Sequence, residues 1–215
     1  MKLLAIHSNH LFFRRNAPNV YAYLAGERNQ NYSTIFDFLD EEYREKRNEG
    51  PLLLREVFTA SAKGLTGKTF NGNCQRFWRE FQLDDISERL GGARENFDVV
   101  IVFTSYPKAV YEELLSEGRI DGLFGVEAAE YQGKIVGMKS IALKNEKQVL
   151  LKMERIGLEE KTTKEPNRYG LLELLIDQMI GYGLGREDVT IVGSGVTAEP
   201  MRKVSGRQVQ DFSKL

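Results

Sequence analysis

Two histidines near the beginning of the sequence are the residues best suited to chemistry. His7 and His10 are the only histidines of the chain, and both follow a short apolar segment, residues 3–6. Because imidazole titrates near neutral pH, the pair could accept a phosphoryl group, transfer protons or bind a metal ion. We identify no third metal ligand beside them. Three interpretations stay open: catalysis by His7, noncatalytic contact with a ligand, or polar side chains that only satisfy hydrogen bonds.

A second segment with chemical potential, residues 62–69, comes close to a phosphate-binding P-loop. Gly67-Lys68-Thr69 matches the end of that motif, but Ala62 stands where its first glycine belongs. A P-loop also needs a strand before it and an acidic residue that ends another strand, and we find neither. We interpret the segment as a turn between helices, with nucleotide binding as the weaker alternative.

The composition is that of a globular protein with balanced charge. The 215 residues include 30 Lys and Arg against 31 Asp and Glu, so we expect no nucleic acid partner. The single cysteine, Cys74, cannot form an internal disulfide, which is typical of a reducing compartment. No apolar stretch approaches the roughly 18 residues of a membrane span. These features predict a cytoplasmic protein that binds neither nucleic acid nor membrane.

The elements that must position the histidines alternate along the chain. Residues 2–6, 97–103, 189–193 and 207–212 have the apolar patterns of strands, and residues 171–180 repeat apolar side chains at helical spacing. This alternation predicts an α/β fold with a doubly wound parallel sheet. In such sheets, ligands bind at the carboxyl ends of the strands, which is where His7 and His10 are expected.

Residues 14–96 differ from the rest because they carry many charges and repeat apolar residues at helical spacing. They predict a helical cap domain, residues 14–96, inserted into a core domain formed by residues 1–13 and 97–215. Within the cap, Gly91-Gly92 is interpreted as the end of a helix. Arg14-Arg15 lies at the junction of the two domains and could reach an anionic ligand.

In the core, the strand at 97–103 is expected to lead into a helix. That helix would carry Val110, Leu114 and Leu115 on one face.

Three segments share the frame of motifs known from one superfamily. His7-Ser8-Asn9-His10-Leu11 follows the first strand, where that superfamily has Asp-x-Asp-x-Thr. Residues 99–104 are similar to its second motif, an apolar strand ending in Ser or Thr. Residues 193–201 are similar to its fourth motif, Gly-Asp-(Ser/Thr)-x-x-Asp-x-x-Met. The chain thus resembles the haloacid dehalogenase-like (HAD) superfamily and its phosphoserine-phosphatase-like branch, which implies a Rossmann-like core, an inserted helical cap and magnesium-dependent phosphatase chemistry.

The resemblance also shows which residues are replaced. His7 and Asn9 occupy the family's catalytic positions, and Ser194 and Ala198 occupy its metal-binding positions. Aspartyl-phosphate chemistry needs a carboxylate nucleophile, and Mg²⁺ normally takes carboxylate oxygens. We therefore assign no catalytic residue and expect no metal and no cofactor.

The phosphate-binding half of the motif set is retained. The resemblance implies that Thr104 and a lysine contact phosphate. The lysine is Lys164 or, alternatively, Lys147, which fits the local pattern of the branch. The full predicted ligand-binding set is Ser8, His10, Thr104, Ser105, Lys164, Ser194 and Gly195.

Two functions follow from these residues. The first is a noncatalytic HAD-like protein that binds inorganic phosphate or a small phosphorylated metabolite, or a protein partner, as an interaction module. The alternative is a divergent HAD-family phosphatase that hydrolyses a small phosphate ester, with Mg²⁺ as cofactor only in this case.

Overall fold

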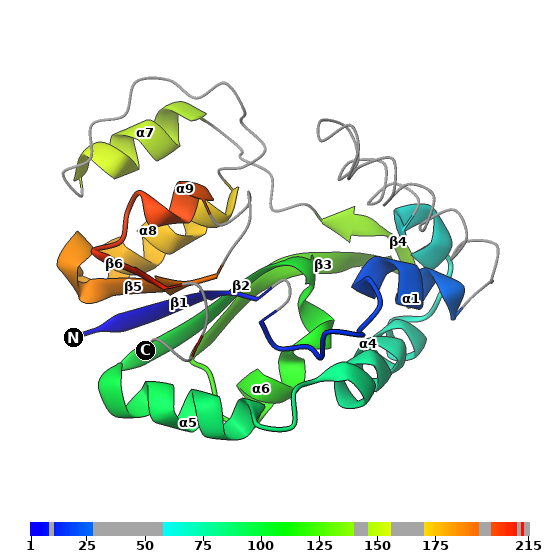
Figure 1. Ribbon diagram of the computed structural model, residues 1–215. Helices are drawn as coiled ribbons and strands as arrows, with labels where there is room; N and C mark the ends of the chain where they lie inside the picture. Colours follow the sequence, from blue (N-terminus) through cyan, green and yellow to red (C-terminus); the bar gives the residue numbers. More distant parts are fainter. Residues whose placement is uncertain are drawn as a thin grey trace, which may run out of the picture.

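The computed structural model describes residues 1–8, 11–27, 58–139, 146–155, 170–193, 199–209 and 212. In this part of the chain, strands form one sheet in the order β4-β3-β2-β1-β5-β6 (Figure 1). The strands are β1 (Leu3–His7), β2 (Val99–Pro107), β3 (Gly122–Tyr131), β4 (Lys134–Lys139), β5 (Val189–Val192) and β6 (Arg207–Val209). All neighbours pair in parallel except β3 and β4, which form an antiparallel hairpin.

Helices lie on both faces of the sheet (Figure 1). The α-helices are α1 (Val20–Gly26), α4 (Gly67–Phe81), α5 (Ile86–Asn96), α6 (Glu112–Ser116), α7 (Glu146–Arg155), α8 (Gly170–Tyr182) and α9 (Glu199–Arg202). The described part of the chain also contains the 3₁₀ turns η1 (Lys108–Val110) and η3 (Arg186–Asp188). The predicted α/β class with a mostly parallel sheet is confirmed.

Alternating side chains of β1 divide the hydrophobic core into two clusters. Leu4 and Ile6 belong to the cluster that includes residues of α4 and α5, which we call the α5-side cluster. Leu3 and Ala5 belong to the cluster that includes residues of α8, which we call the α8-side cluster. Every residue of β1 is buried, as expected for a parallel strand covered on both faces.

Helix α8 confirms the helical pattern of residues 171–180. The side chains of its apolar face are fully buried in the α8-side cluster: Leu172, Leu175, Ile176 and Met179. These positions follow the spacing of one helical face, and the sheet supplies the apolar surface against which they pack.

Helix α5 corrects one prediction. Gly91 and Gly92 do not end the helix, which continues to Asn96. Glycine inside a helix costs only about 1 kcal/mol. Burial of Ile86, Leu90 and Ala93 against the sheet outweighs that cost.

The segment after β2 corrects another prediction. The chain makes the 3₁₀ turn η1 before the short helix α6, instead of one continuous helix. Val110 and Leu114 are buried as expected, but Leu115 is 43% exposed. The change of helix type alters the rotation per residue, so the three side chains do not share one face.

The P-loop-like residues begin a helix. Thr66 is the N-cap of α4, and its hydroxyl accepts a hydrogen bond from the Thr69 N–H at 3.1 Å. Residues 58–62 before it are helical, so the described structure has no strand at the place where a P-loop requires one. The interpretation as a turn between helices is confirmed.

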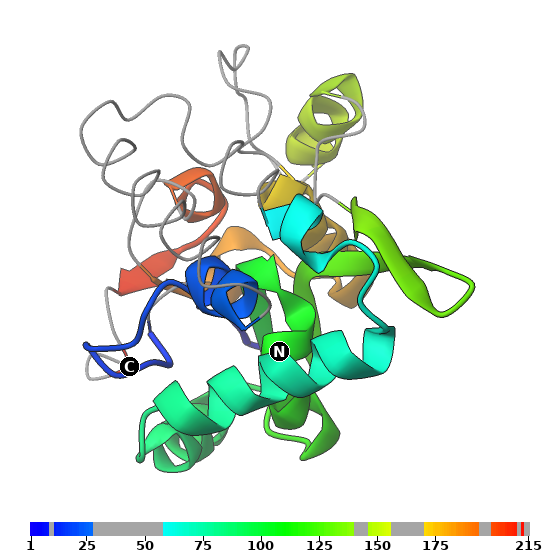
Figure 2. The same ribbon diagram turned by 90° about the vertical axis from the view of Figure 1, so that its right-hand side faces the viewer.

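Backbone hydrogen bonds attach this turn to the β3–β4 hairpin. The Gly64 N–H donates to the Ile135 carbonyl and the Ile135 N–H to the Leu65 carbonyl, both at 2.8 Å. Figure 2 shows the hairpin projecting beside the helical segment that precedes α4. Helices α4 and α5 also pack into the cluster that β1 and β2 form. The boundaries of the predicted cap domain stay a prediction.

The described helices include none with the length and apolar character required to span a bilayer.

Candidate functional site

The carboxyl ends of β1, β2 and β5 bring several of the predicted residues together. His7 ends β1 and pairs in register with Phe103, the residue before Thr104. The Ser8 N–H donates to the Phe103 carbonyl at 3.0 Å, which extends this pairing by one residue. His7 is 2% exposed, and Ser8 and Thr104 are fully buried. The sheet topology therefore collects residues that are almost a hundred positions apart in sequence.

Several predicted residues lie outside the described part of the chain. These are Asn9, His10, Lys164, Ser194, Gly195 and Ala198. Lys147 lies in α7, but its side chain is not among those described. Ser105 is half-buried in β2, and its carbonyl accepts a hydrogen bond from the Tyr21 hydroxyl of α1.

Thr104 uses its hydroxyl inside the protein. Its Oγ1 accepts a hydrogen bond from the Tyr106 N–H at 3.0 Å. Because side chains alternate along a strand, Thr104 lies on the same face as Val100 and Val102, which belong to the α5-side cluster. The phosphate contact predicted for Thr104 stays a prediction.

Tyr111 is a neighbour of this hydroxyl that the sequence did not indicate. It is fully buried, and burial raises the pKa of its phenol strongly, while the nearby Ser8 and Thr104 hydroxyls act in the opposite direction. Within the described chain, the Tyr111 and Ser8 hydroxyls make no hydrogen bond of acceptable geometry. Three hydroxyls from β2, the segment after β1 and the segment after η1 thus lie near one another.

The end of β5 is marked by Gly193, which has φ +147°. Its N–H donates to the Val209 carbonyl at 3.1 Å, and its carbonyl accepts from Arg202 Nη2 at 2.8 Å. A Cβ on Gly193 would lie 2.9 Å from the His7 Cβ, so the two strand ends are in direct contact. Glycine is required here both by the backbone conformation and by the close approach.

Arg202 is the second residue that the sequence analysis missed. It is half-buried in α9, and its guanidinium reaches the carboxyl end of β5. A guanidinium has five N–H donors, so the bond to Gly193 leaves four for other acceptors. Its place after Met201, the last residue of the fourth-motif frame, was the only available signal.

The buried polar side chains of the described residues are His7, Ser8, Ser61, Thr104, Thr190 and Ser205. No carboxylate is among them, and the described residues contain no group of three or more His, Cys, Asp or Glu side chains that could hold a metal ion. Mg²⁺ prefers carboxylate oxygens. The described donors at the strand ends, an imidazole and hydroxyls, do not fit that ion.

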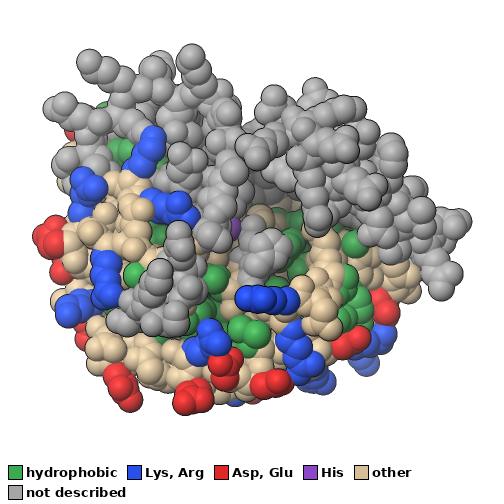
Figure 3. Space-filling view, in the orientation of Figure 1, with side chains coloured by type: hydrophobic (Ala, Val, Ile, Leu, Met, Phe, Trp, Pro, Cys, Tyr) green, Lys and Arg blue, Asp and Glu red, His purple; other side chains and the backbone are tan. Residues whose placement is uncertain are grey.

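A hollow of about 210 Å³ lies beside the end of β2. It is lined by Phe13, Arg14, Arg15, Ala17, Pro18, Val20 and Tyr106. Arg14 Nη2 also pairs with Asp84 Oδ1 at 2.6 Å. Both arginines thus line this hollow. Their predicted place at a junction of two domains and their contact with an anionic ligand stay predictions. On the face in Figure 3, basic and acidic side chains are interspersed along the lower part of the described surface.

Comparisons with known proteins show which solved structures share this fold. No protein-family model matches the chain, and no curated protein matches it. A substrate-bound phosphoserine phosphatase has a TM-score of 0.66 and 14% identity, with 96% of this chain and 84% of the other covered. A HAD family hydrolase from Salmonella enterica serovar Typhi has a TM-score of 0.66 and 14% identity, covering 95% and 60%. Cytosolic 5′-nucleotidase IIIB bound to cytidine has a TM-score of 0.53 and 9% identity, covering 97% and 71%.

These identities are too low to transfer an activity, but the similarity in structure extends over nearly the whole chain. The predicted resemblance is therefore confirmed at the level of structure: this protein has the HAD-like fold that phosphoserine phosphatases share.

Proposed function

We propose that this protein binds inorganic phosphate or a small phosphorylated metabolite at the carboxyl ends of β1, β2 and β5, without hydrolysing it, and serves as a binding or interaction module. One observation carries the proposal. The buried polar groups described at these strand ends are an imidazole and hydroxyls, and no described carboxylate is buried with them.

The residue types argue against aspartyl-phosphate chemistry. His7 stands where the HAD motif has its nucleophilic aspartate, and Asn9 where it has the second aspartate. A carboxamide does not titrate between pH 5 and 8, so Asn9 cannot serve as a general acid for a leaving alcohol. Phosphoryl transfer would therefore lack both its usual acceptor and its proton donor.

The same residue types favour anion binding. Phosphate oxygens are acceptors, and they are bound well by guanidinium groups, hydroxyls and backbone N–H groups. Arg202 brings a guanidinium to the end of β5. Because no described carboxylate is buried at these strand ends, an anion bound there needs no metal ion to offset such repulsion.

A divergent hydrolase is the second candidate, favoured by the position of His7. An imidazole nitrogen at the end of β1 could accept the phosphoryl group while the P–O bond to the alcohol breaks. Water would then have to release the phosphate from the histidine, and the leaving alcohol would need a proton from a group other than Asn9.

The two functions are separated by measuring binding and turnover on the same protein. Isothermal titration with inorganic phosphate should give saturable binding that persists in EDTA, and p-nitrophenyl phosphate should not be hydrolysed above background with or without Mg²⁺. Arg202→Met should weaken the binding of phosphate, whereas Arg155→Met, on the exposed end of α7, should leave it unchanged. Turnover that requires Mg²⁺ would contradict the noncatalytic function, and turnover lost in His7→Ala would establish the divergent hydrolase.

A restoration series tests the reasoning from the missing acids. His7→Asp with Asn9→Asp should not produce phosphatase activity, because Ser194 and Ala198 still offer no metal-binding carboxylate. Activity from that double variant alone would show that the fourth-motif positions are not what limits catalysis.

A further inference from the structure

We propose that Tyr111 is a positioning residue for the phosphate site: its buried phenol holds the hydroxyls of Ser8 and Thr104, and thereby the carboxyl ends of β1 and β2. The inference rests on the function proposed above, but it concerns a residue outside every motif of the sequence. Tyr111 follows η1 and comes from neither of the two strands.

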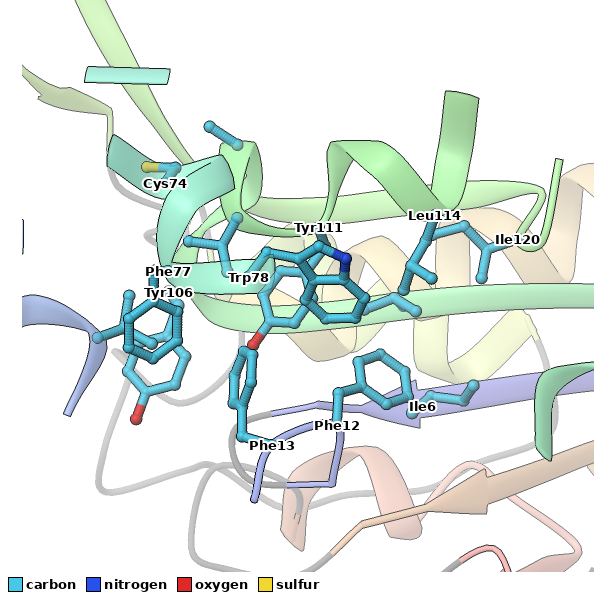
Figure 4. Packing of buried hydrophobic residues seen from close by; sticks show 14 of the residues in the cluster. Ile6, Phe12, Phe13, Cys74, Phe77, Trp78, Tyr106, Tyr111, Leu114 and Ile120 are labelled. Carbon is cyan, nitrogen blue, oxygen red and sulfur yellow. The ribbon is translucent and has the colours of Figure 1, made fainter. Parts of the chain in front are cut away.

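The phenol cannot move away from the strand ends, because its ring is enclosed. The centroids of Phe13 and Trp78 each lie 5.7 Å from that of Tyr111, and the centroid of Phe12 lies at 5.9 Å. Figure 4 shows Tyr111 surrounded by these rings inside the α5-side cluster. An enclosed aromatic ring gives its hydroxyl a fixed position, which is the property a positioning group needs.

Two of the described hydroxyls, those of Ser8 and Thr104, lie near the phenol. Ser8, Thr104 and Tyr111 are all fully buried, and both Ser8 and Thr104 lie close enough to affect the ionisation of Tyr111. Thr104 Oγ1 already accepts from the Tyr106 N–H, so the hydrogen of the Thr104 hydroxyl is available to donate elsewhere.

Burial makes mutual hydrogen bonding of these groups the favourable arrangement. A buried hydroxyl without a partner is strongly disfavoured, and buried polar groups are nearly always hydrogen-bonded. Ser8 has a short side chain whose rotation moves only its Oγ, whereas the Tyr111 ring is fixed. Among the described residues, neither Ser8 Oγ nor Tyr111 Oη has a hydrogen-bond partner in the structure. The proposal therefore requires a small rotation of the Ser8 side chain that brings its Oγ to Tyr111 Oη.

The hydroxyl contacts of Tyr111 affect the phosphate site through the backbone. Ser8 directly follows His7, and the Ser8 N–H is bonded to the Phe103 carbonyl, next to Thr104. Fixing the Ser8 and Thr104 side chains thus fixes the ends of both strands. A strand end that is already in position loses less freedom when an anion binds, which raises affinity.

The test is a double-mutant cycle read by two measurements. Tyr111→Phe and Ser8→Ala remove one hydroxyl each and preserve the fold, because both changes keep or reduce the volume of the side chain. Each should raise the Kd for inorganic phosphate about fivefold, as expected for one lost hydrogen bond, and lower Tm by about 2–4 °C. The double variant should be hardly worse than either single variant, because both remove the same interaction.

Ile86→Val is the matched control, since Ile86 is buried in the same cluster on α5. It should lower Tm by a similar amount and leave the Kd for phosphate unchanged. If Tyr111→Phe lowers Tm but binds phosphate like the wild-type protein, Tyr111 is only a core residue and the inference is wrong. If the wild-type protein binds no phosphate, the proposed function fails, and the Tm values of the cycle alone test the contact between Tyr111 and Ser8. If the Tm shifts of the two single variants add up in the double variant, the contact is wrong; if they do not add up, the contact is established.

Discussion

Gly193→Ala is the substitution for which the structure predicts the sharpest effect. Gly193 has φ +147°, a conformation that residues with a Cβ rarely adopt. The added Cβ would lie 2.9 Å from the His7 Cβ and 3.0 Å from the His7 carbonyl oxygen. Both contacts involve atoms that cannot rotate away, so the ends of β1 and β5 would have to move apart.

The magnitude follows from two separate costs. A residue held in a sparsely populated backbone region costs about 1–3 kcal/mol. Forcing extra atoms into a packed region costs about another 1–3 kcal/mol. The free energy of unfolding should therefore fall by about 2–6 kcal/mol. For a chain of this length the Tm should fall by at least about 4 °C.

Gly91→Ala is the control, because it makes the same chemical change with the opposite expected sign. Gly91 lies inside α5, and a Cβ there would meet nothing within 4 Å. Alanine should stabilise the helix by about 0.5–1 kcal/mol. Urea unfolding of both variants, with unchanged m-values, measures the two effects on one scale. If Gly193→Ala proves as stable as the wild-type protein, the close contact between the ends of β1 and β5 is wrong.

Three further predictions concern the core and the surface. Leu175→Ala, at a fully buried position of α8, should cost about 2–5 kcal/mol by urea unfolding, whereas Leu115→Ala should stay within about 0.5 kcal/mol; equal effects would contradict the assignment of the buried faces. Burial raises the pKa of the Cys74 thiol well above its ordinary value, so a thiol reagent at pH 8 should modify it only after unfolding, and rapid labelling of the folded protein would show that Cys74 is accessible. The hydrogen bond from Lys108 to Glu127, 2.5 Å long, lowers the pKa of Glu127. The stability that this ion pair contributes is therefore present above the ordinary glutamate pKa and is lost as the pH falls through the lowered pKa of Glu127. Because the pair is well exposed, the effect should be small and weakened by salt, and the pH dependence of Tm should be reduced in Lys108→Met; an identical profile would contradict the pairing.

The sequence predicted best the helices and strands whose buried apolar residues recur at a regular spacing. Leu172, Leu175, Ile176 and Met179 mark the buried face of α8 because burial on one side of a helix imposes a 3.6-residue period. The apolar segment at the start of the chain likewise indicated β1. Once parallel strands were expected, the gathering of His7, Ser8 and Thr104 at one edge followed from the rule that parallel strands end on the same side.

The sequence failed where a local preference was outweighed by packing, or where a contact joined distant segments. Gly91 and Gly92 favour the end of a helix, but burial of the residues around them against the sheet carries α5 onward to Asn96. Tyr111 lies in no motif, and Arg202 had only its position after Met201 as a signal, because the way a segment folds back onto the sheet decides which of its side chains reaches a strand end.

The amino-acid sequence thus determined which residue types stand at the motif positions: His7, Asn9, Ser194 and Ala198, where the HAD motifs have acids. Only the tertiary structure decided which groups lie beside His7 and the described ends of the neighbouring strands. It enclosed Tyr111 beside Ser8 and Thr104, brought Arg202 to Gly193, and pressed Gly193 against His7. The physical reason is that side-chain identity is a property of single positions, whereas burial and proximity arise from the pairing of strands far apart in the chain.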